Sequence, residues 1–256
     1  MKTSTLIVWI LIPYFIFMNF IVQAQDAAIV PFTASESISF LIVQLPDQTK
    51  TDRINNFLVN SVLGEGFTIA NFKDKLTQQS KKTEGLTALS YKININTPSV
   101  LSLIISTCWT GAHENCLESQ YNFDLTTGYN FTLDQVITPS NWSDVEKLVC
   151  NDCRQRMLEA KAKAQKELGN SWYEKDWFDK SYESQWQEEY QKLQHCGIEV
   201  DRKFHLSPDG IGFYYSSMQF LPMVSRNYAP NPEYFYSWTV IKPFLMPSNP
   251  ISNLVK

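Results

Sequence analysis

Tyr91, Ile93 and Ile95 alternate with polar neighbours within residues 86–96, and residues 100–109 form a second strand-like run. A period of two is typical of a β-strand that buries one face, so each stretch is predicted to be a strand. The turn-like residues 97–99 separate them, and two further strand-like runs follow at 117–125 and 130–133. Such short connections join antiparallel strands, so the centre of the chain is predicted to be a meander.

Before the meander, a strand-like apolar run over residues 37–45 gives way to helical spacing. Residues 51–63 predict an amphipathic helix capped by Thr51 or Asp52, because apolar residues recur there every three or four positions. A second, short helix is predicted over residues 71–79.

After the meander, a long helical region extends over residues 143–193. Ser143 and Glu146 have the spacing of a capping box, in which the two side chains satisfy free amides at a helix start. We predict one helix from there to about Leu168 and a second, aromatic-rich helix over 172–193.

The last third of the chain returns to strand-like runs, at residues 203–206, 211–220 and 234–241. The predicted fold class is therefore α+β, an antiparallel meander sheet packed by helices, with a helical hairpin inserted around residues 143–193. We expect an N-terminal α+β subdomain over residues 25–97 and a C-terminal antiparallel β/α subdomain over residues 98–256.

The first 24 residues have the three-part layout of a signal peptide. Lys2 is followed by an apolar run from Leu6 to Val22, and the small residue Ala24 precedes a polar continuation. We expect cleavage after Ala24 and an exported protein, periplasmic or secreted, with no stable membrane span afterwards. The alternative is an uncleaved membrane anchor, although the run is slightly shorter than the ~20 residues that cross a bilayer.

The charge of the chain narrows the class of partner. The formal net charge is −4, and loss of Lys2 with the signal peptide would make it −5. Lysines and arginines form no basic block, which argues against a nucleic-acid partner.

All five cysteines lie after the expected cleavage site, and disulfides are the default interpretation of cysteines outside the reducing cytoplasm. Cys108 and Cys116 flank a turn-like stretch between two predicted strands, so a cross-strand bond is expected if the register allows it. Cys150 and Cys153 lie on a predicted helix from which either could reach Cys196. The preferred second pair is Cys153 with Cys196.

A metal site is the alternative for the same region. Cys150, Cys153, His195 and Cys196 are soft ligands of the kind that zinc accepts. The last two are adjacent in sequence, which strains a tetrahedral arrangement. We therefore expect no metal and no other cofactor.

Acid–base chemistry would have to start from three histidines or from carboxylates. His113 and Glu114 on the predicted turn are the best candidates for a site, and with Trp109 and Gly111 they are the expected binding residues. The simpler interpretation is that Gly111 shapes a tight turn and that His113 caps a backbone carbonyl.

Asp124 and Asp134 could be paired acids for sugar chemistry, but we expect them to end strands by bonding to turn amides. We find no recognisable catalytic motif and predict no catalytic residue. The alternative is a cell-envelope hydrolase that uses His113 with Glu114 or Asp124.

Aromatic residues are concentrated in the second predicted helix of the hairpin: Trp172, Tyr173, Trp177, Phe178, Tyr182, Trp186 and Tyr190. They could stack on glycan rings or anchor a protein partner. The last four are spaced by four residues, which places them on one helical face and favours burial against the sheet.

A family resemblance is carried by five segments, at residues 101–103, 110–113, 121–128, 131–134 and 204–215. In order and spacing they resemble the RsiV/PdaC-type exported accessory domain family. Its members include a lysozyme-sensing anti-sigma factor and the non-catalytic part of some peptidoglycan deacetylases. The resemblance covers most of the chain after residue 24 and implies a non-enzymatic domain that binds a lysozyme-like protein or peptidoglycan.

The chain departs from that family's pattern in two places. Family members often carry Gly-Gly-Ala-His-Gly at the central turn, where this chain has Thr110 to Glu114, and the helical region over 143–193 is longer than expected. We also find no deacetylase motif and no sigma-binding segment before the apolar run, so we expect neither of those activities. A structural exported protein without a ligand is the remaining possibility.

Overall fold

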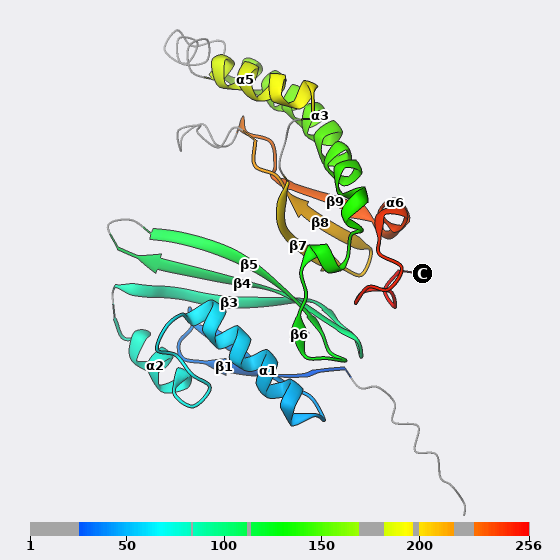
Figure 1. Ribbon diagram of the computed structural model, residues 1–256. Coiled ribbons are helices and arrows are strands. Elements are labelled where there is room, and N and C mark those ends of the chain that lie inside the picture. Colours follow the sequence, from blue (N-terminus) through cyan, green and yellow to red (C-terminus); the bar gives the residue numbers. More distant parts are fainter. Residues whose placement is uncertain are drawn as a thin grey trace, which may run out of the picture.

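The computed structural model describes residues 26–82, 84–111, 114–168, 182–196, 200–217 and 228–255. These residues form two-, four- and three-stranded antiparallel sheets with helices packed on them, which confirms the α+β fold class (Figure 1). The expected signal peptide lies outside the described residues. Within the described part, no helix is long and apolar enough to span a bilayer.

The N-terminal part begins with a two-stranded sheet. Strand β1 (Ala28–Thr33) pairs with β2 (Ser39–Gln44), and helix α1 (Gln48–Leu58) follows. Helix α1 begins earlier than predicted because Asp47, rather than Thr51 or Asp52, caps it by accepting the amide of Thr49 at 2.9 Å. A π-helical turn, Val59–Leu63, extends the helix.

Helix α2 (Phe72–Gln79) leads into the predicted meander. Its strands are β3 (Gly85–Asn96), β4 (Val100–Thr110), β5 (Glu114–Asp124) and β6 (Tyr129–Asn130), in that spatial order. One face of this sheet is apolar and packs on α1, where the Phe57 ring lies 5.6 Å from the Phe123 ring. Short 3-10 turns follow at Leu133–Gln135 and Pro139–Asn141.

The helical region contains α3 (Trp142–Leu168) and α5 (Glu183–Gln194), which supports the predicted hairpin for the described residues. Helix α3 begins at Trp142, so Ser143 lies inside its first turn and not before it as a cap. The three-stranded sheet consists of β7 (Asp201–Ser207), β8 (Gly210–Tyr214) and β9 (Glu233–Ser237).

The strand predicted over residues 234–241 is only half correct. It ends at Ser237, and α6 (Trp238–Ile241) follows, then a 3-10 turn, Lys242–Phe244. The Trp238 side chain donates to the Pro208 carbonyl at 2.8 Å, and its amide donates to the Asp209 carbonyl at 3.1 Å. These bonds to the β7–β8 turn end the strand at this point.

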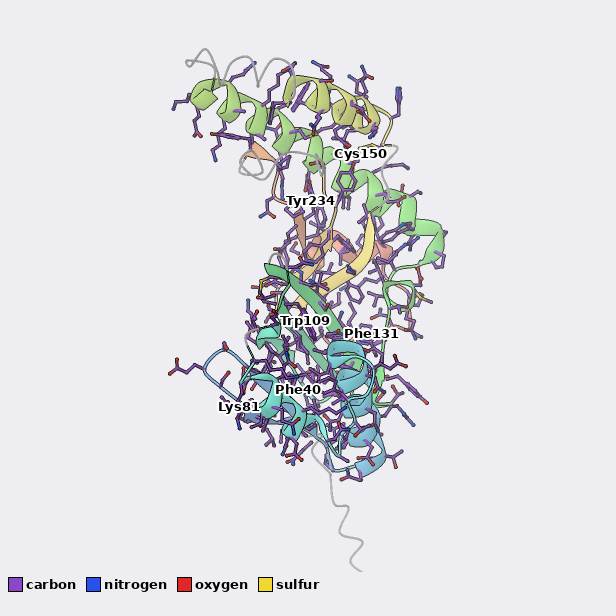
Figure 2. The ribbon with its side chains drawn as sticks, turned by 90° about the vertical axis from the view of Figure 1, so that its left-hand side faces the viewer. Phe40, Lys81, Trp109, Phe131, Cys150 and Tyr234 are labelled. Carbon is purple, nitrogen blue, oxygen red and sulfur yellow. A yellow bond between two sulfur atoms is a disulfide. The ribbon has the colours of Figure 1, made fainter. Side chains whose placement is uncertain are left out.

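Two hydrophobic cores lie along the length of the molecule. The first, which includes Phe40 and Leu101, joins α1 and α2 to the apolar face of the meander. The second, which includes Phe131 and Tyr234, joins α3 and α5 to the three-stranded sheet (Figure 2). The subdomain boundary expected after residue 97 would fall between β3 and β4, which are paired neighbours, and the division stays a prediction.

Two disulfides are present, and the second differs from the preferred pair. Cys108 is bonded to Cys116 between directly opposed positions of β4 and β5. Cys196 is bonded to Cys150, not to Cys153, which corrects the expected Cys153–Cys196 pair. The two cysteines share a face of α3, but Cys153 lies about 4.5 Å further along the helix axis, where it is buried beside Tyr234.

The Cys150–Cys196 bond also argues against the zinc alternative, because it uses two of the four proposed ligands. Among the described residues, no group of three or more histidine, cysteine or acidic side chains could hold a metal ion.

We expect the Cys153 thiol to be unreactive in the native protein. The side chain is fully buried, and burial raises the pKa of the thiol, so the reactive thiolate is scarce. Mass spectrometry after iodoacetamide treatment should find Cys153 unlabelled in native protein and labelled after unfolding without reductant. Rapid native labelling of Cys153 would contradict its burial.

Candidate functional site: a polar cleft between two sheets

The face of the meander opposite α1 carries many polar residues beside the apolar Val100 and Ile104, and polar residues are unusual on a sheet face covered by a second sheet. Alternation places Ser102 and Ser106 of β4 on this face, while Leu101, Leu103 and Ile105 enter the first core. The opposed positions on β5 are also polar, because Ser102 pairs with Asn122 and Ser106 with Glu118.

The three-stranded sheet is anchored to this polar face by buried hydrogen bonds. Ser102 donates to the Asn122 side chain at 2.7 Å, and Asn122 donates to the backbone carbonyl of Phe204 on β7 at 3.1 Å. Both polar side chains are almost completely buried. Such a satisfied network positions one sheet on the other more specifically than apolar contacts would.

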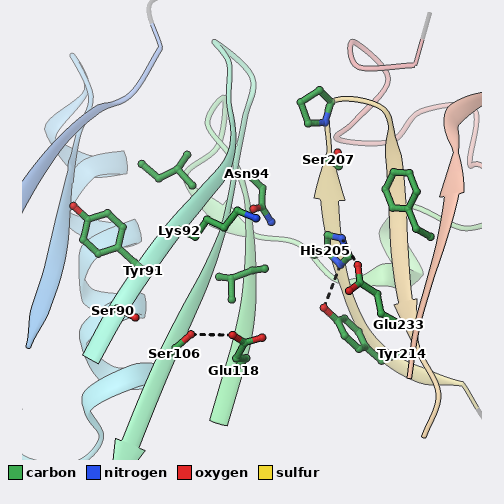
Figure 3. A pocket seen from close by; sticks show the side chains of 14 residues that line it. Ser90, Tyr91, Lys92, Asn94, Ser106, Glu118, His205, Ser207, Tyr214 and Glu233 are labelled. Atoms are coloured by element: carbon green, nitrogen blue, oxygen red, sulfur yellow. Dashed lines mark hydrogen bonds and ion pairs between the residues drawn. The ribbon is translucent and has the colours of Figure 1, made fainter. Parts of the chain in front are cut away.

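A cleft of about 640 Å³ lies beside this anchor, between the two sheets (Figure 3). Lys92 and Asn94 of β3 and Glu118 of β5 line it from the meander, and His205, Glu233 and Phe235 line it from the other sheet. Figure 3 shows Lys92 and Asn94 extending from β3 toward the opposite wall. This volume is in the range of ligand sites in proteins.

Three neighbouring side chains hold His205 in place. Its Nε2 lies 3.2 Å from a Glu233 carboxylate oxygen, and its Nδ1 lies 3.2 Å from the Tyr214 hydroxyl. The imidazole ring lies nearly parallel to the Phe235 ring, with the ring centres 6.3 Å apart. The histidine is 8% exposed.

This geometry suits a neutral imidazole. With the proton on Nε2, the ring donates to Glu233, and Nδ1 accepts from the Tyr214 hydroxyl, so both nitrogens are satisfied. Burial lowers the pKa of His205 and nearby Lys92 lowers it further, whereas Glu233 opposes these effects. Burial also raises the pKa of Tyr214 to about 12, so its hydroxyl remains a donor.

Gly212 provides the space for this histidine. The two residues are paired across β7 and β8, and a Cβ atom at position 212 would lie 1.9 Å from His205 Cε1. No substitution fits unless the imidazole moves. Gly212 is thus part of the site although it carries no side chain.

The Tyr214, His205 and Glu233 side chains have the connectivity of a proton relay. Burial raises the pKa of Tyr214 to about 12 and lowers that of His205, so the neutral forms of both side chains are favoured. The arrangement presents a fixed set of donors and acceptors to the cleft.

The lowered pKa of His205 predicts a pH-dependent contribution to stability. A histidine whose folded pKa lies below the unfolded value of about 6.5 stabilises the fold above that value. The contribution is lost as the pH falls through the folded pKa. In urea unfolding from pH 8 to pH 5, the stability advantage of wild type over His205→Gln should therefore shrink on acidification. An advantage that grew instead would mean that the Glu233 ion pair dominates.

Of the binding residues predicted from sequence, Trp109 and Gly111 do not line this cleft. Trp109 is 42% exposed, and strand alternation places its side chain on the face opposite Ser106 and Glu118. Gly111 is exposed, His113 lies outside the described residues, and Glu114 begins β5 with a side chain that is also outside them. The binding role of His113 and Glu114 stays a prediction.

The proposed pairing of His113 with Asp124 for hydrolysis stays a prediction, because His113 lies outside the described residues. Asp124 is the last residue of β5. Its side chain accepts the amide of Thr126 at 2.8 Å, which is the turn-ending role that we preferred. Asp134 pairs with Arg202 at 2.9 Å on the surface.

The described part of the aromatic stretch is core, as the spacing favoured. Tyr182 and Trp186 are buried, and Trp186 donates to the Met157 carbonyl at 3.0 Å. Trp186 thus packs on helix α3 rather than on the sheet, whereas the Tyr182 hydroxyl donates to the Tyr228 carbonyl at 3.0 Å. The remaining members before residue 182 lie outside the described residues.

Comparisons with known proteins identify fold relatives only. No family model matches the chain, and no curated protein has a significantly similar sequence. Similar solved structures include a DUF3298 family member from Bacteroides fragilis, at a TM-score of 0.53 and 17% identity, covering 90% of this chain and 96% of that one. A DUF3298 family protein from Pseudomonas aeruginosa matches at a TM-score of 0.49 and 13% identity, covering 86% and 93%. The chain thus shares its fold with the first of these proteins over nearly its whole length.

Proposed function

We propose that this protein is a non-enzymatic exported binding domain and that its ligand site is the cleft between the two sheets. The observation that carries the proposal is the fixed polar wall of His205, Glu233 and Tyr214 beside the exposed ring of Phe235. An aromatic surface next to convergent donors and acceptors is the usual composition of a recognition site.

An unpaired polar group on the opposite wall supports the same assignment. Asn94 lines the cleft, and among the described residues its buried amide nitrogen has no hydrogen-bond partner. Native proteins seldom leave such an atom unpaired, and a bound ligand is one way to satisfy it.

Two disulfides fit an exported protein, because such bonds form and persist in oxidising compartments. The resemblance to the RsiV/PdaC-type family supports the finer proposal, periplasmic or secreted recognition of a lysozyme-like protein or of peptidoglycan. Neither ligand requires a catalytic group in this chain.

Calorimetric titration tests the proposal. Protein recovered after export is titrated with lysozymes and with soluble peptidoglycan fragments, and we expect saturable binding to one of them at micromolar or lower Kd. Absence of binding to every one of these ligands would overturn the proposal.

Two aromatic variants then locate the site. Phe235→Ala removes an exposed ring from the cleft, and Trp109→Ala removes a ring of equal exposure from the β4–β5 hairpin. We expect Phe235→Ala to weaken binding at least about tenfold and Trp109→Ala to leave it unchanged. The reverse result would move the site to the hairpin predicted from sequence.

A further inference from the structure

The cleft carries an excess of negative charge. Glu118 and Glu233 face it from opposite walls, and Lys92 is the cation that faces it among the described residues. His205 is satisfied as the neutral tautomer and adds no charge. The four groups together therefore contribute a formal charge of −1, from one cation and two carboxylates.

Glu233 and Phe235 form a combined surface on one side of β9. The residues are two apart on the strand, so their side chains point to the same face. The Glu233 side chain is 42% exposed, and Phe235 is 43% exposed. A carboxylate beside an accessible aromatic face attracts an organic cation by charge and by the ring quadrupole together.

The structure already contains this type of contact elsewhere. The Arg53 guanidinium lies 3.9 Å from the centre of the Tyr129 ring, and the Lys161 ammonium lies 4.0 Å from the Trp186 ring while it pairs with Glu183 at 2.6 Å. The second example joins a cation, a carboxylate and an aromatic ring. Glu233 and Phe235 present the same two acceptors to the cleft.

We infer that the cleft receives an arginine or lysine side chain of a protein partner, held between Glu233 and Phe235 with Glu118 on the opposite wall. This inference rests on the proposed function, because it assigns a partner chemistry to the same cleft. It selects a basic protein surface over a neutral or acidic glycan. The net charge of −4 for the whole chain acts in the same direction by attracting a basic partner.

Lys92 has a definite role under this inference. Its ammonium faces the same cleft, so it repels an incoming cation and partly screens the carboxylates. Removing the Lys92 charge should strengthen binding of a basic group, whereas removing the Glu233 charge should weaken it. A ligand with a negative charge would show the opposite signs.

The test uses two blocked tripeptides that differ only in charge. One has arginine at its centre, and the other has citrulline, which keeps the shape of arginine without its positive charge. NMR titration of the full exported protein follows the His205 and Phe235 signals. We expect the arginine peptide to bind at least about tenfold more tightly, a ratio that corresponds to 1.4 kcal/mol.

Three variants complete the test. Glu233→Gln should reduce affinity for the arginine peptide about tenfold, and Lys92→Met should increase it several-fold. Glu36→Gln makes the same charge change on the exposed β1–β2 turn, outside the cleft, and should leave affinity unchanged. The gain in Lys92→Met cannot arise from misfolding, so it keeps the test decisive if Glu233→Gln perturbs the fold.

Equal affinities for the two peptides, no shift of cleft signals by either peptide, or weaker binding by Lys92→Met would overturn the inference. Lysozyme or glycan binding that persists in such a case would leave the proposed function intact with a different ligand chemistry. Arginine selectivity without binding to any lysozyme or glycan would support the inference and refute the proposed partners.

Discussion

Replacing both Cys150 and Cys196 by alanine is expected to lower the free energy of unfolding by about 4 kcal/mol. The bond joins residues 46 apart, and closing a loop of that length in the unfolded chain removes conformational entropy on this scale. It also fixes the end of α5 to α3. Urea unfolding of non-reduced protein measures the loss.

Two control variants separate this effect from general damage. Replacing Cys108 and Cys116 removes a bond between residues only 8 apart and should cost about 2.5 kcal/mol. Cys153→Ala leaves both bonds intact and should cost about 1 kcal/mol from the lost burial. If Cys153→Ala proved as damaging as loss of Cys196, the pairing described above would be refuted.

Gly212→Ala is expected to destabilise the protein by about 2 kcal/mol and to weaken ligand binding in the cleft. The new methyl group would lie 1.9 Å from His205 Cε1, so the imidazole must leave its position. The contacts of His205 with Tyr214 and Glu233 are then lost together. Urea unfolding and the NMR signals of the His205 ring report the two consequences.

A double-mutant cycle tests that mechanism. In a His205→Ala background the obstructing ring is absent, so Gly212→Ala should cost less than about 1 kcal/mol. Gly111→Ala serves as the matched control, because a methyl group there has no neighbour within 4 Å and should change stability by less than about 0.5 kcal/mol. An unchanged cost of Gly212→Ala in both backgrounds would show that the clash does not involve His205.

The meander was the most predictable part of the fold. The strands predicted over 86–96 and 100–109 match β3 and β4 almost to the residue, although two register irregularities interrupt β3. The strand predicted to reach residue 241 ended at Ser237, since its end depends on hydrogen bonds between Trp238 and the distant β7–β8 turn. Contacts between segments distant in sequence leave no periodic signal.

The cleft residues were not predicted from the sequence, for a related reason. His113 and Trp109 are rare residue types, and they favoured the hairpin between β4 and β5 as the predicted binding site. Glu118, Gln120 and Asn122 are polar at every second position of the sequence, but this pattern is equally typical of a strand face exposed to solvent. The sequence around Gly212 contains no pattern that predicts its contact with His205, because the contact depends on the register of β7 and β8.

The sequence by itself determined the local elements, the fold class and the presence of cysteines suited to an oxidising compartment. These follow from the periodicity and chemistry of neighbouring residues. Only the tertiary structure decided which α3 cysteine meets Cys196 and which face of the meander borders the cleft. It also brought His205, Tyr214 and Glu233 together. The physical reason is that strand register and helix rotation determine these contacts only after distant segments have packed.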